Sequence, residues 1–185
     1  RVIKDTLTGN SKIIAVVKAD AYGHGAVAVA KALEKETDMF ALSSIDEVVQ
    51  LRNAGVRGDM LILGYTPSQF AKVLQNEKIT QTVFSYDYIK DIYDSLDGKG
   101  DKLKVHVKLD TGMSRLGFAV QNDEMRKKTV EELFRAVNEF SDRLDFEGIF
   151  THFAVSDEPE QDFTDIQFYR YIKTVEELEE KGVHF

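Results

Sequence analysis

A lysine stands at the end of a short apolar run near the start of the chain. Residues 13–17 are rich in β-branched side chains, which is typical of a buried strand, and Lys18 follows them directly. Partial loss of hydration lowers the pKa of a lysine, and a neutral amine can form a Schiff base. Tyr22 could donate its hydroxyl to a ligand phosphate. The stretch therefore allows amine chemistry, although such a lysine can also extend into solvent and such a tyrosine can be a packing residue.

Two later apolar runs also end in polar side chains. Alternation places Lys108 on one face of residues 103–109 and His152 on one face of residues 146–153. Helices that cover a parallel sheet or barrel pack against its apolar faces, so the faces that carry Lys18, Lys108 and His152 should point away from the helices. We therefore expect all three side chains at the carboxyl ends of their strands, where α/β folds bind ligands.

The elements that must position these residues alternate along the chain. Apolar runs predict strands at residues 13–17, 39–42, 60–63, 79–84, 103–109 and 146–153. A helical pattern follows each run, at residues 24–34, 44–55, from 66 onward, 89–96, 130–140 and 166–175. Ser44 and Glu47 form a capping box at the second of these helices. Strict alternation of strand and helix predicts an α/β fold with a parallel sheet.

An open doubly wound sheet and a (β/α)8 TIM-type barrel both fit this alternation. The dinucleotide fingerprint is missing, since Gly23 and Gly25 are followed by Ala28. Polar residues at the ends of three strands favour the barrel, whose mouth collects them. Six strand–helix units are present, and the chain ends at Phe185 within a new apolar run. We expect an incomplete barrel cut from a longer protein.

Composition excludes several other classes of function. The 185 residues can bury one core, and a net charge of −8 argues against a general nucleic-acid or anionic-membrane surface. Without cysteine the chain forms no disulfide or thiolate zinc site, and no apolar stretch approaches ~20 residues, so we expect no membrane contact from this segment. We expect a cytoplasmic location. The carboxylates of residues 157–162 should form a solvated loop, and no metal is assigned.

Three blocks of the sequence resemble signatures of the alanine racemases. Residues 17–25, Val-Lys-Ala-Asp-Ala-Tyr-Gly-His-Gly, resemble the pyridoxal phosphate signature of that family. Residues 108–117, Lys-Leu-Asp-Thr-Gly-Met-Ser-Arg-Leu-Gly, resemble the second signature, and residues 148–154, Gly-Ile-Phe-Thr-His-Phe-Ala, the third. The blocks occur in family order. The resemblance implies that residues 1–185 are a partial N-terminal barrel domain that binds pyridoxal phosphate, without the family's C-terminal β-domain.

The resemblance also implies a role for each matching side chain. Lys18 matches the lysine that holds pyridoxal phosphate through a Schiff base and moves the proton on one face of the substrate α-carbon. Tyr22 matches the tyrosine that hydrogen-bonds the cofactor phosphate. Arg115 matches the arginine that contacts the cofactor's phenolic oxygen and the substrate carboxylate, which suits a fixed, charged guanidinium. His152 matches a histidine that supports the arginine facing the pyridine nitrogen.

Lys108 matches a lysine that is often carbamylated in the family. Carbamylation would turn a buried cation beside Arg115 into an anion that orients it. The structural alternative is a strand-end salt bridge from Lys108 to Asp110 or to another neighbouring residue.

The family pattern extends beyond this sequence. The arginine that faces the pyridine nitrogen, most of the phosphate site and the second base, a tyrosine from the partner's β-domain, have no counterpart in residues 1–185. The resemblance therefore implies that the full-length protein is a homodimeric isomerase that interconverts L- and D-alanine. D-Alanine is a peptidoglycan precursor. The resemblance also implies that residues 1–185 are inactive alone.

Three alternatives stay open. The first is a serine or broad-spectrum racemase, or the racemase portion of a membrane-anchored protein. The second is a non-catalytic pyridoxal phosphate carrier, against which Arg115 argues because a carrier needs no group to bind a substrate carboxylate. The third is a purely structural role for Lys18, Lys108 and His152 as ordinary strand-end residues.

Overall fold

The computed structural model describes residues 2–158 and 162–185, so Glu160 of the acidic loop lies outside the described residues. The chain forms two compact units. The first unit contains Arg1–Thr66 and Glu77–Gln81, and the second contains Pro67–Asn76 and Thr82–Phe185. Within the described residues, no helix combines the length and the apolar character that a membrane crossing requires.

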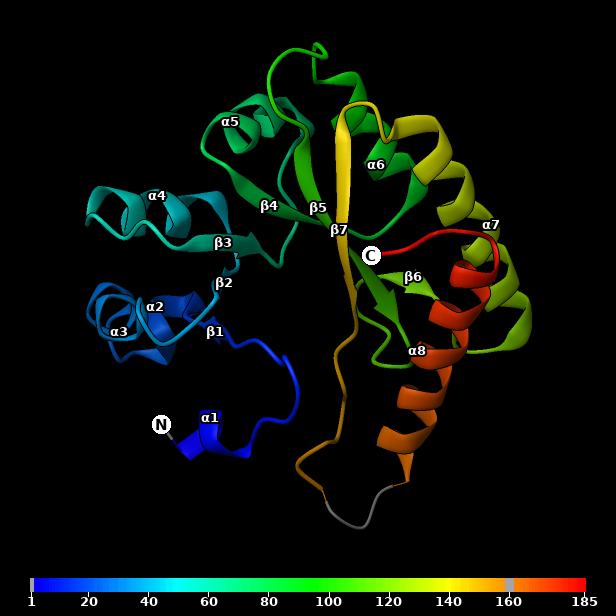
Figure 1. Ribbon diagram of the computed structural model, residues 1–185, viewed down its shortest axis with the longest axis horizontal. Helices are drawn as coiled ribbons and strands as arrows, with labels where there is room; N and C mark the ends of the chain where they lie inside the picture. The colour runs from blue at the N-terminus through cyan, green and yellow to red at the C-terminus, as the bar shows by residue number, and fades with distance from the viewer. Residues whose placement is uncertain (1, 159–161) are drawn as a thin grey trace. The chain divides into compact units, whose positions relative to one another are not determined.

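The first unit is a parallel sheet with helices between its strands. β1 (Ile14–Val16) pairs with β2 (Met39–Leu42), β2 with β3 (Asp59–Ile62), and β3 with residues 79–81 of β4 (Ile79–Val83). The helices are α1 (Val2–Thr6), α2 (Lys18–Tyr22), α3 (Ala26–Leu33) and α4 (Ile45–Asn53), in blue to cyan in Figure 1. Fully buried side chains from β2, β3 and α4 form its core, among them Phe40, Leu42, Leu51, Met60 and Ile62.

The second unit is organised around β5 (Leu103–Asp110). β7 (Leu144–Phe150) pairs with β5 in parallel along its length, and the short β6 (Phe118–Ala119) pairs with the carboxyl end of β5. The helical elements are the 3-10 turn η1 (Ser68–Phe70), α5 (Ala71–Asn76), α6 (Tyr86–Asp94), α7 (Asp123–Phe140) and α8 (Phe163–Glu180). Figure 1 shows β7 along β5 and the long helices α7 and α8 against each other.

The two faces of β5 differ as the alternation predicts. Leu103, Val105, Val107 and Leu109 are at most 1% exposed and form the core of the second unit, whereas Lys108 lies on the opposite face. Because the register pairs Lys108 with Phe150, this face of β5 continues onto β7.

A β-bulge interrupts the pairing of β5 with β7. Val105 lies opposite Phe146, but the next residue, His106, lies opposite Gly148, so Glu147 is the extra residue of the bulge. The Glu147 carboxylate lies 2.5 Å from Lys104 Nζ and 3.5 Å from His106 Nε2. The register beyond the bulge is the one that brings Phe150 beside Lys108.

These elements confirm the predicted parallel α/β fold. The elements α1, α2 and β6 were not predicted, and β1 is not buried as predicted, because Ile14 and Val16 are each 44% exposed.

Two predicted elements also differ locally. The helix predicted from residue 66 begins as η1, and Pro67 is its N-cap because its ψ of 134° is extended. β7 ends at Phe150, so the predicted strand position of His152 is wrong. The reason is a tertiary contact: the Thr151 hydroxyl donates to the carbonyl oxygen of Leu109 on β5 at 3.0 Å, and this side-chain bond replaces further backbone pairing.

Candidate functional site

The turn that carries Lys18 and Tyr22 is wound left-handed. The φ angles of Ala19, Asp20, Ala21 and Tyr22 lie between 51° and 55°, although none of these residues is glycine. Left-handed backbone costs roughly 1–2 kcal/mol per L-residue, and such strain persists where surrounding contacts enforce it, often at functional sites. Lys18 is half-buried, and Tyr22, one turn later, is 63% exposed.

Contacts from distant residues hold this turn. Glu47 Oε1 on α4 accepts the Ala19 N–H at 2.7 Å, and Glu47 Oε2 accepts the Ser43 N–H at 2.7 Å. Asp20 Oδ1 accepts the N–H of Ala26, the first residue of α3, at 2.7 Å. Partial burial acts to raise the pKa of Glu47, but the hydrogen bonds from Ser43 and Ala19 outweigh it, so the pKa lies below its ordinary value. The carboxylate of Glu47 therefore holds the start of the turn, and the turn's own Asp20 joins it to the start of α3.

The loop after β5 is closed by a buried carboxylate. Asp110 Oδ1 accepts the N–H groups of Gly112 at 3.0 Å and Ser114 at 2.9 Å, and the exposed Arg115 follows. At Gly117, φ is 136° and a Cβ would lie 2.6 Å from the Asp110 backbone nitrogen, so only glycine lets the chain return this close to β5. The loop presents Arg115 from a compact, defined turn.

Lys108 is buried at the end of β5 beside this loop. Its side chain is 8% exposed, and its Nζ lies 4.7 Å from the centroid of the Phe150 ring. Burial and then the positive charge of Arg115 lower the pKa of Lys108 to about 8, and Asp110 opposes the shift. Among the described residues, no ion pair joins Lys108 to Asp110, whose Oδ1 is engaged by the loop. A substantial fraction of this amine is therefore neutral near pH 8.

The predicted site residues fall into two groups. Lys18 and Tyr22 share the left-handed turn of the first unit. Lys108, Arg115 and His152 belong to the second unit, where Lys108 and Arg115 are close enough to interact electrostatically. The His152 side chain is exposed in the loop after β7.

Two polar residues that position these groups were not predicted as site residues. Glu47 has a sequence signal, because it occupies the capping-box position after Ser44, whose Oγ accepts the Glu47 N–H at 3.4 Å. Its contact with Ala19, however, is not visible in the sequence. Gln167 is completely buried on α8 and contacts the loops after β5 and β7. The sequence does not indicate this burial, because a single glutamine in an amphipathic helix is ordinarily expected to face solvent.

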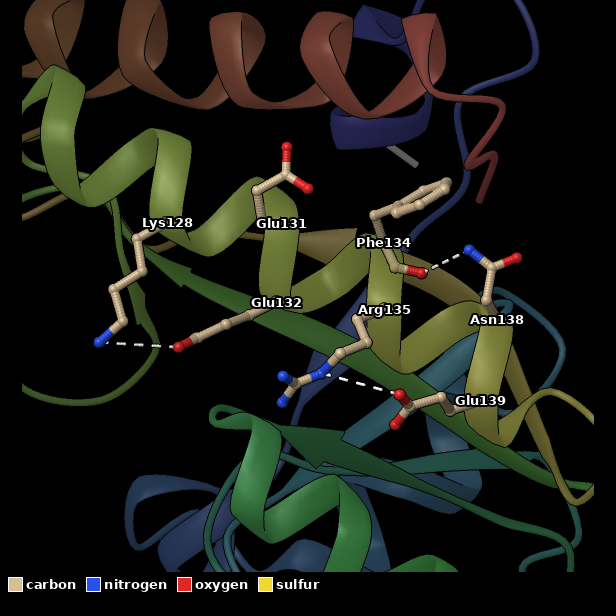
Figure 2. A pocket seen from close by; sticks show the side chains of 7 residues that line it. All are labelled: Lys128, Glu131, Glu132, Phe134, Arg135, Asn138 and Glu139. Carbon is tan, nitrogen blue, oxygen red and sulfur yellow. Dashed lines mark hydrogen bonds and ion pairs between the residues drawn. The ribbon is translucent and has the colours of Figure 1, made fainter.

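A surface hollow of about 610 Å³ lies along one face of α7, and none of the residues named above lines it. Figure 2 shows that its charged side chains pair along the helix, Lys128 with Glu132 and Arg135 with Glu139. Such i,i+4 pairs are ordinary for a solvated helix face. In the described ranges, no three side chains of metal-ligand type converge on a cation position.

Comparison with known proteins gives one consistent result. The family model for the alanine racemase N-terminal domain matches residues 1–185. An alanine racemase of Caldanaerobacter subterraneus subsp. tengcongensis is 39% identical over 185 residues, which are 100% of this chain and 46% of the relative. An alanine racemase of Clostridium perfringens is 41% identical over 179 residues, 96% of this chain and 45% of the relative. The chain spans about half the length of the curated relatives it matches.

Solved structures agree. The alanine racemase of Clostridium difficile 630 in complex with cycloserine has a TM-score of 0.89 and 41% identity, covering 99% of this chain and 49% of that chain. A histidine racemase from Leuconostoc mesenteroides subsp. sake has a TM-score of 0.80 and 31% identity, covering 92% of this chain and 44% of that chain. These matches support the predicted incomplete TIM-type barrel.

Proposed function

Because the chain belongs to the family of alanine racemase N-terminal domains, we propose that residues 1–185 are the partial cofactor-binding barrel of a longer isomerase that interconverts L- and D-alanine. The proposal includes the family's C-terminal β-domain beyond this segment, a homodimer in which the partner supplies the second base, and a cytoplasmic location. The observation that carries it is the strained left-handed turn at the family's lysine motif, which Glu47 holds at Ala19 and which its own Asp20 joins to α3.

The side chains present fit pyridoxal phosphate. A Schiff base requires an amine, and Lys18 provides one directly after the buried Val17. A phosphate requires hydrogen-bond donors, and Tyr22 offers an exposed phenol one turn away. When bound, the cofactor would delocalise the negative charge left on the substrate α-carbon after its proton leaves.

Lys18 has two tasks in this proposal. Its amine binds the cofactor through Nζ, and after release the same Nζ accepts and returns the α-proton on one face of the substrate. The left-handed turn serves both tasks because it fixes the backbone from which the side chain starts. Tyr22 holds the phosphate, so three left-handed residues, Ala19 to Ala21, separate the amine from the residue that anchors the phosphate.

Arg115 binds the substrate carboxylate and the cofactor's phenolic oxygen in this proposal. The guanidinium suits both because it is always charged and donates in a fixed fork. Arg115 lies in the loop that the Asp110 carboxylate closes. This closed loop supports the role, because a residue that positions the substrate needs a fixed backbone. This arginine favours an enzyme over a non-catalytic carrier.

We further propose that Lys108 is carbamylated. The neutral amine attacks carbon dioxide, a C–N bond forms, and one proton is released to solvent. The pKa lowered to about 8 supplies the neutral amine that reacts, and the neighbouring guanidinium of Arg115 favours an anion in place of the ammonium. The carbamate would then orient Arg115. His152, in the loop after β7, would support the arginine that faces the pyridine nitrogen.

Racemisation assays on the full-length protein test the proposal. With saturating pyridoxal phosphate we expect kcat/KM to be higher for L-alanine than for L-serine or L-histidine, and residues 1–185 alone should be inactive. A higher value for L-serine or L-histidine would reassign the substrate, and the histidine racemase structure shows that this fold occurs with that activity. Absence of racemisation with all three amino acids would contradict the enzyme assignment.

A further inference from the structure

Gln167 lies between the two loops that carry Arg115 and His152. It projects from α8, is 0% exposed, and uses both ends of its side-chain amide. Nε2 donates to Thr111 Oγ1 at 3.0 Å and to the His152 carbonyl oxygen at 3.2 Å. Oε1 accepts the Ala154 N–H at 2.8 Å. A buried group with these partners is costly to remove, because each partner would stay buried without a hydrogen bond.

The donor and the acceptor of each hydrogen bond in this network can be assigned in only one way. Thr151 Oγ1 donates its proton to the Leu109 carbonyl oxygen at 3.0 Å. The Thr111 hydroxyl, 2.8 Å from Thr151 Oγ1, must therefore donate to it and can accept from Gln167. The chain of bonds runs from Gln167 through Thr111 and Thr151 to β5. It leaves the glutamine amide a single favourable orientation.

The same face of α8 presses on the loop after β5. Arg170 Nη1 donates to the Thr111 carbonyl oxygen at 2.7 Å. A Cβ at Gly112 would lie 2.7 Å from Phe163 Cζ and 3.0 Å from Arg170 Nη1, so the loop approaches the helix without room for a side chain. Phe163, Gln167 and Arg170 occur at helical spacing on one face. The loop after β5 therefore packs closely against this face of α8, and Gln167 is the buried polar residue of the face.

We propose that Gln167 is a positioning residue that locks the loop of Arg115 to the loop of His152. The inference rests on the proposed function, since its value to the enzyme lies in fixing the group that binds the substrate carboxylate. Neither loop is joined to the other by a regular β-ladder beyond Phe150, where β7 ends. Gln167 replaces that missing ladder, because it binds backbone on one side and a hydroxyl on the other.

Thr174 provides a matched control. It lies two turns after Gln167 on the same helix, is also 0% exposed, and its hydroxyl donates to the Arg170 carbonyl oxygen at 2.7 Å within α8. Thr174→Val therefore removes a buried hydrogen bond without touching either loop. Thr111→Val removes the acceptor of Gln167 at nearly constant shape, and Thr111→Ser restores a hydroxyl.

The test measures amide hydrogen exchange and racemase kinetics on the full-length protein. In Gln167→Leu, which loses all three side-chain hydrogen bonds of Gln167, exchange within residues 110–117 and 151–154 should be at least about tenfold faster, because both loops open more easily. Thr111→Val should reproduce the change, whereas Thr111→Ser and Thr174→Val should stay near the wild type. kcat/KM for L-alanine should fall about tenfold or more in Gln167→Leu and less than about twofold in Thr174→Val.

The two readouts separate this inference from the function on which it rests. If exchange in both loops is unchanged in Gln167→Leu and Thr111→Val, the positioning role is overturned whatever the activity. If exchange accelerates but racemisation by the variants equals that of an active wild type, the locking is irrelevant to catalysis and the inference is likewise overturned. A wild type without racemase activity would contradict the proposed function, and the exchange data would still decide whether Gln167 locks the loops. Should Gln167→Leu fail to fold, Thr111→Val is compared with Thr151→Val, because the first loses the bonds of Thr111 to both Gln167 and Thr151, and the second keeps the bond to Gln167. Exchange that is equally fast in both variants would overturn the role of Gln167.

Discussion

Glu47 Oε1 accepts the N–H of Ala19 at 2.7 Å, although 28 positions separate the two residues in the chain. Ala19 directly follows Lys18 and is the first residue of the left-handed turn with a positive φ. The contact explains why an alanine, which strongly favours right-handed helix, stays in this conformation. The backbone that carries the reactive amine is therefore held by a carboxylate on α4, which follows α3 and β2 in the chain.

Replacing Glu47 with glutamine should destabilise this turn. Glutamine keeps one acceptor oxygen but cannot accept from both Ala19 and Ser43, so we expect a loss of about 1–2 kcal/mol in the free energy of unfolding. Urea unfolding at neutral pH measures this loss. Asp46→Asn is the matched control, because it removes an exposed charge from the same first turn of α4.

The acid dependence of stability gives a second readout for Glu47. Its folded pKa lies below the ordinary 4.5, so its stabilisation is complete above that value and is lost as the pH falls through the folded pKa. Glu47→Gln should lose less stability than the wild type between neutral pH and a pH below 4.5. Equal acid sensitivity of the two proteins would show that the carboxylate does not hold the turn.

Lys108 should take up carbon dioxide selectively. In the presence of carbon-13 bicarbonate, we expect one carbamate carbonyl signal in the NMR spectrum. At fixed dissolved carbon dioxide it should grow as the pH rises through about 8, because only the neutral amine reacts. The signal should vanish in Lys108→Met and persist in Lys104→Met, which removes an exposed lysine of the same strand. A signal that survives in Lys108→Met would place the modification elsewhere.

His106 should make the protein less stable in mild acid. Burial lowers its pKa below 6.5, and the nearby Glu147 only partly opposes this effect. The unfolded chain therefore binds a proton below pH 6.5 that the folded protein does not, and stability falls as the pH drops below that value. His106→Gln should flatten this part of the stability curve, whereas the exposed control His184→Gln should not. Identical curves for wild type and His106→Gln would refute the assignment.

Gly117 should tolerate no side chain. Gly117→Ala places a Cβ 2.6 Å from the Asp110 backbone nitrogen at a φ of 136°, and we expect a loss of more than about 2 kcal/mol. Gly182→Ala also has a positive φ, of 81°, but meets no atom within 4 Å, so its cost should be only about 1 kcal/mol. Denaturant unfolding of both variants separates the cost of a positive φ, which both share, from the cost of the steric clash, which only Gly117→Ala has. Equal losses would mean that the loop can move away from β5.

The sequence predicts the elements of this fold well because their signals are local. Residues 39–42 form β2 with the predicted bounds, and Ser44 caps α4. A continuous apolar run and a capping serine act within a few residues, so no distant partner is needed. Lys108 also lies on the predicted face of β5, because alternation is a property of the strand itself.

The features that could not be predicted depend on tertiary contacts. The left-handed turn contradicts the propensities of Ala19 and Ala21 and exists only with partners such as Glu47. His152 was expected on the strand, but the side-chain bond from Thr151 to Leu109 ends the ladder. Gln167 was not recognised, because burial of one polar residue on an amphipathic helix is decided by what it meets.

Chemical trapping tests whether Lys18 carries the cofactor. The full-length protein is loaded with pyridoxal phosphate, reduced with borohydride and digested, and the modified peptide is sequenced by mass spectrometry. We expect a single pyridoxyl group on Lys18, and its loss in Lys18→Arg without labelling elsewhere. A label on Lys108 or another lysine, or an unlabelled Lys18 in the loaded protein, would contradict the assignment of Lys18 as the cofactor-binding lysine.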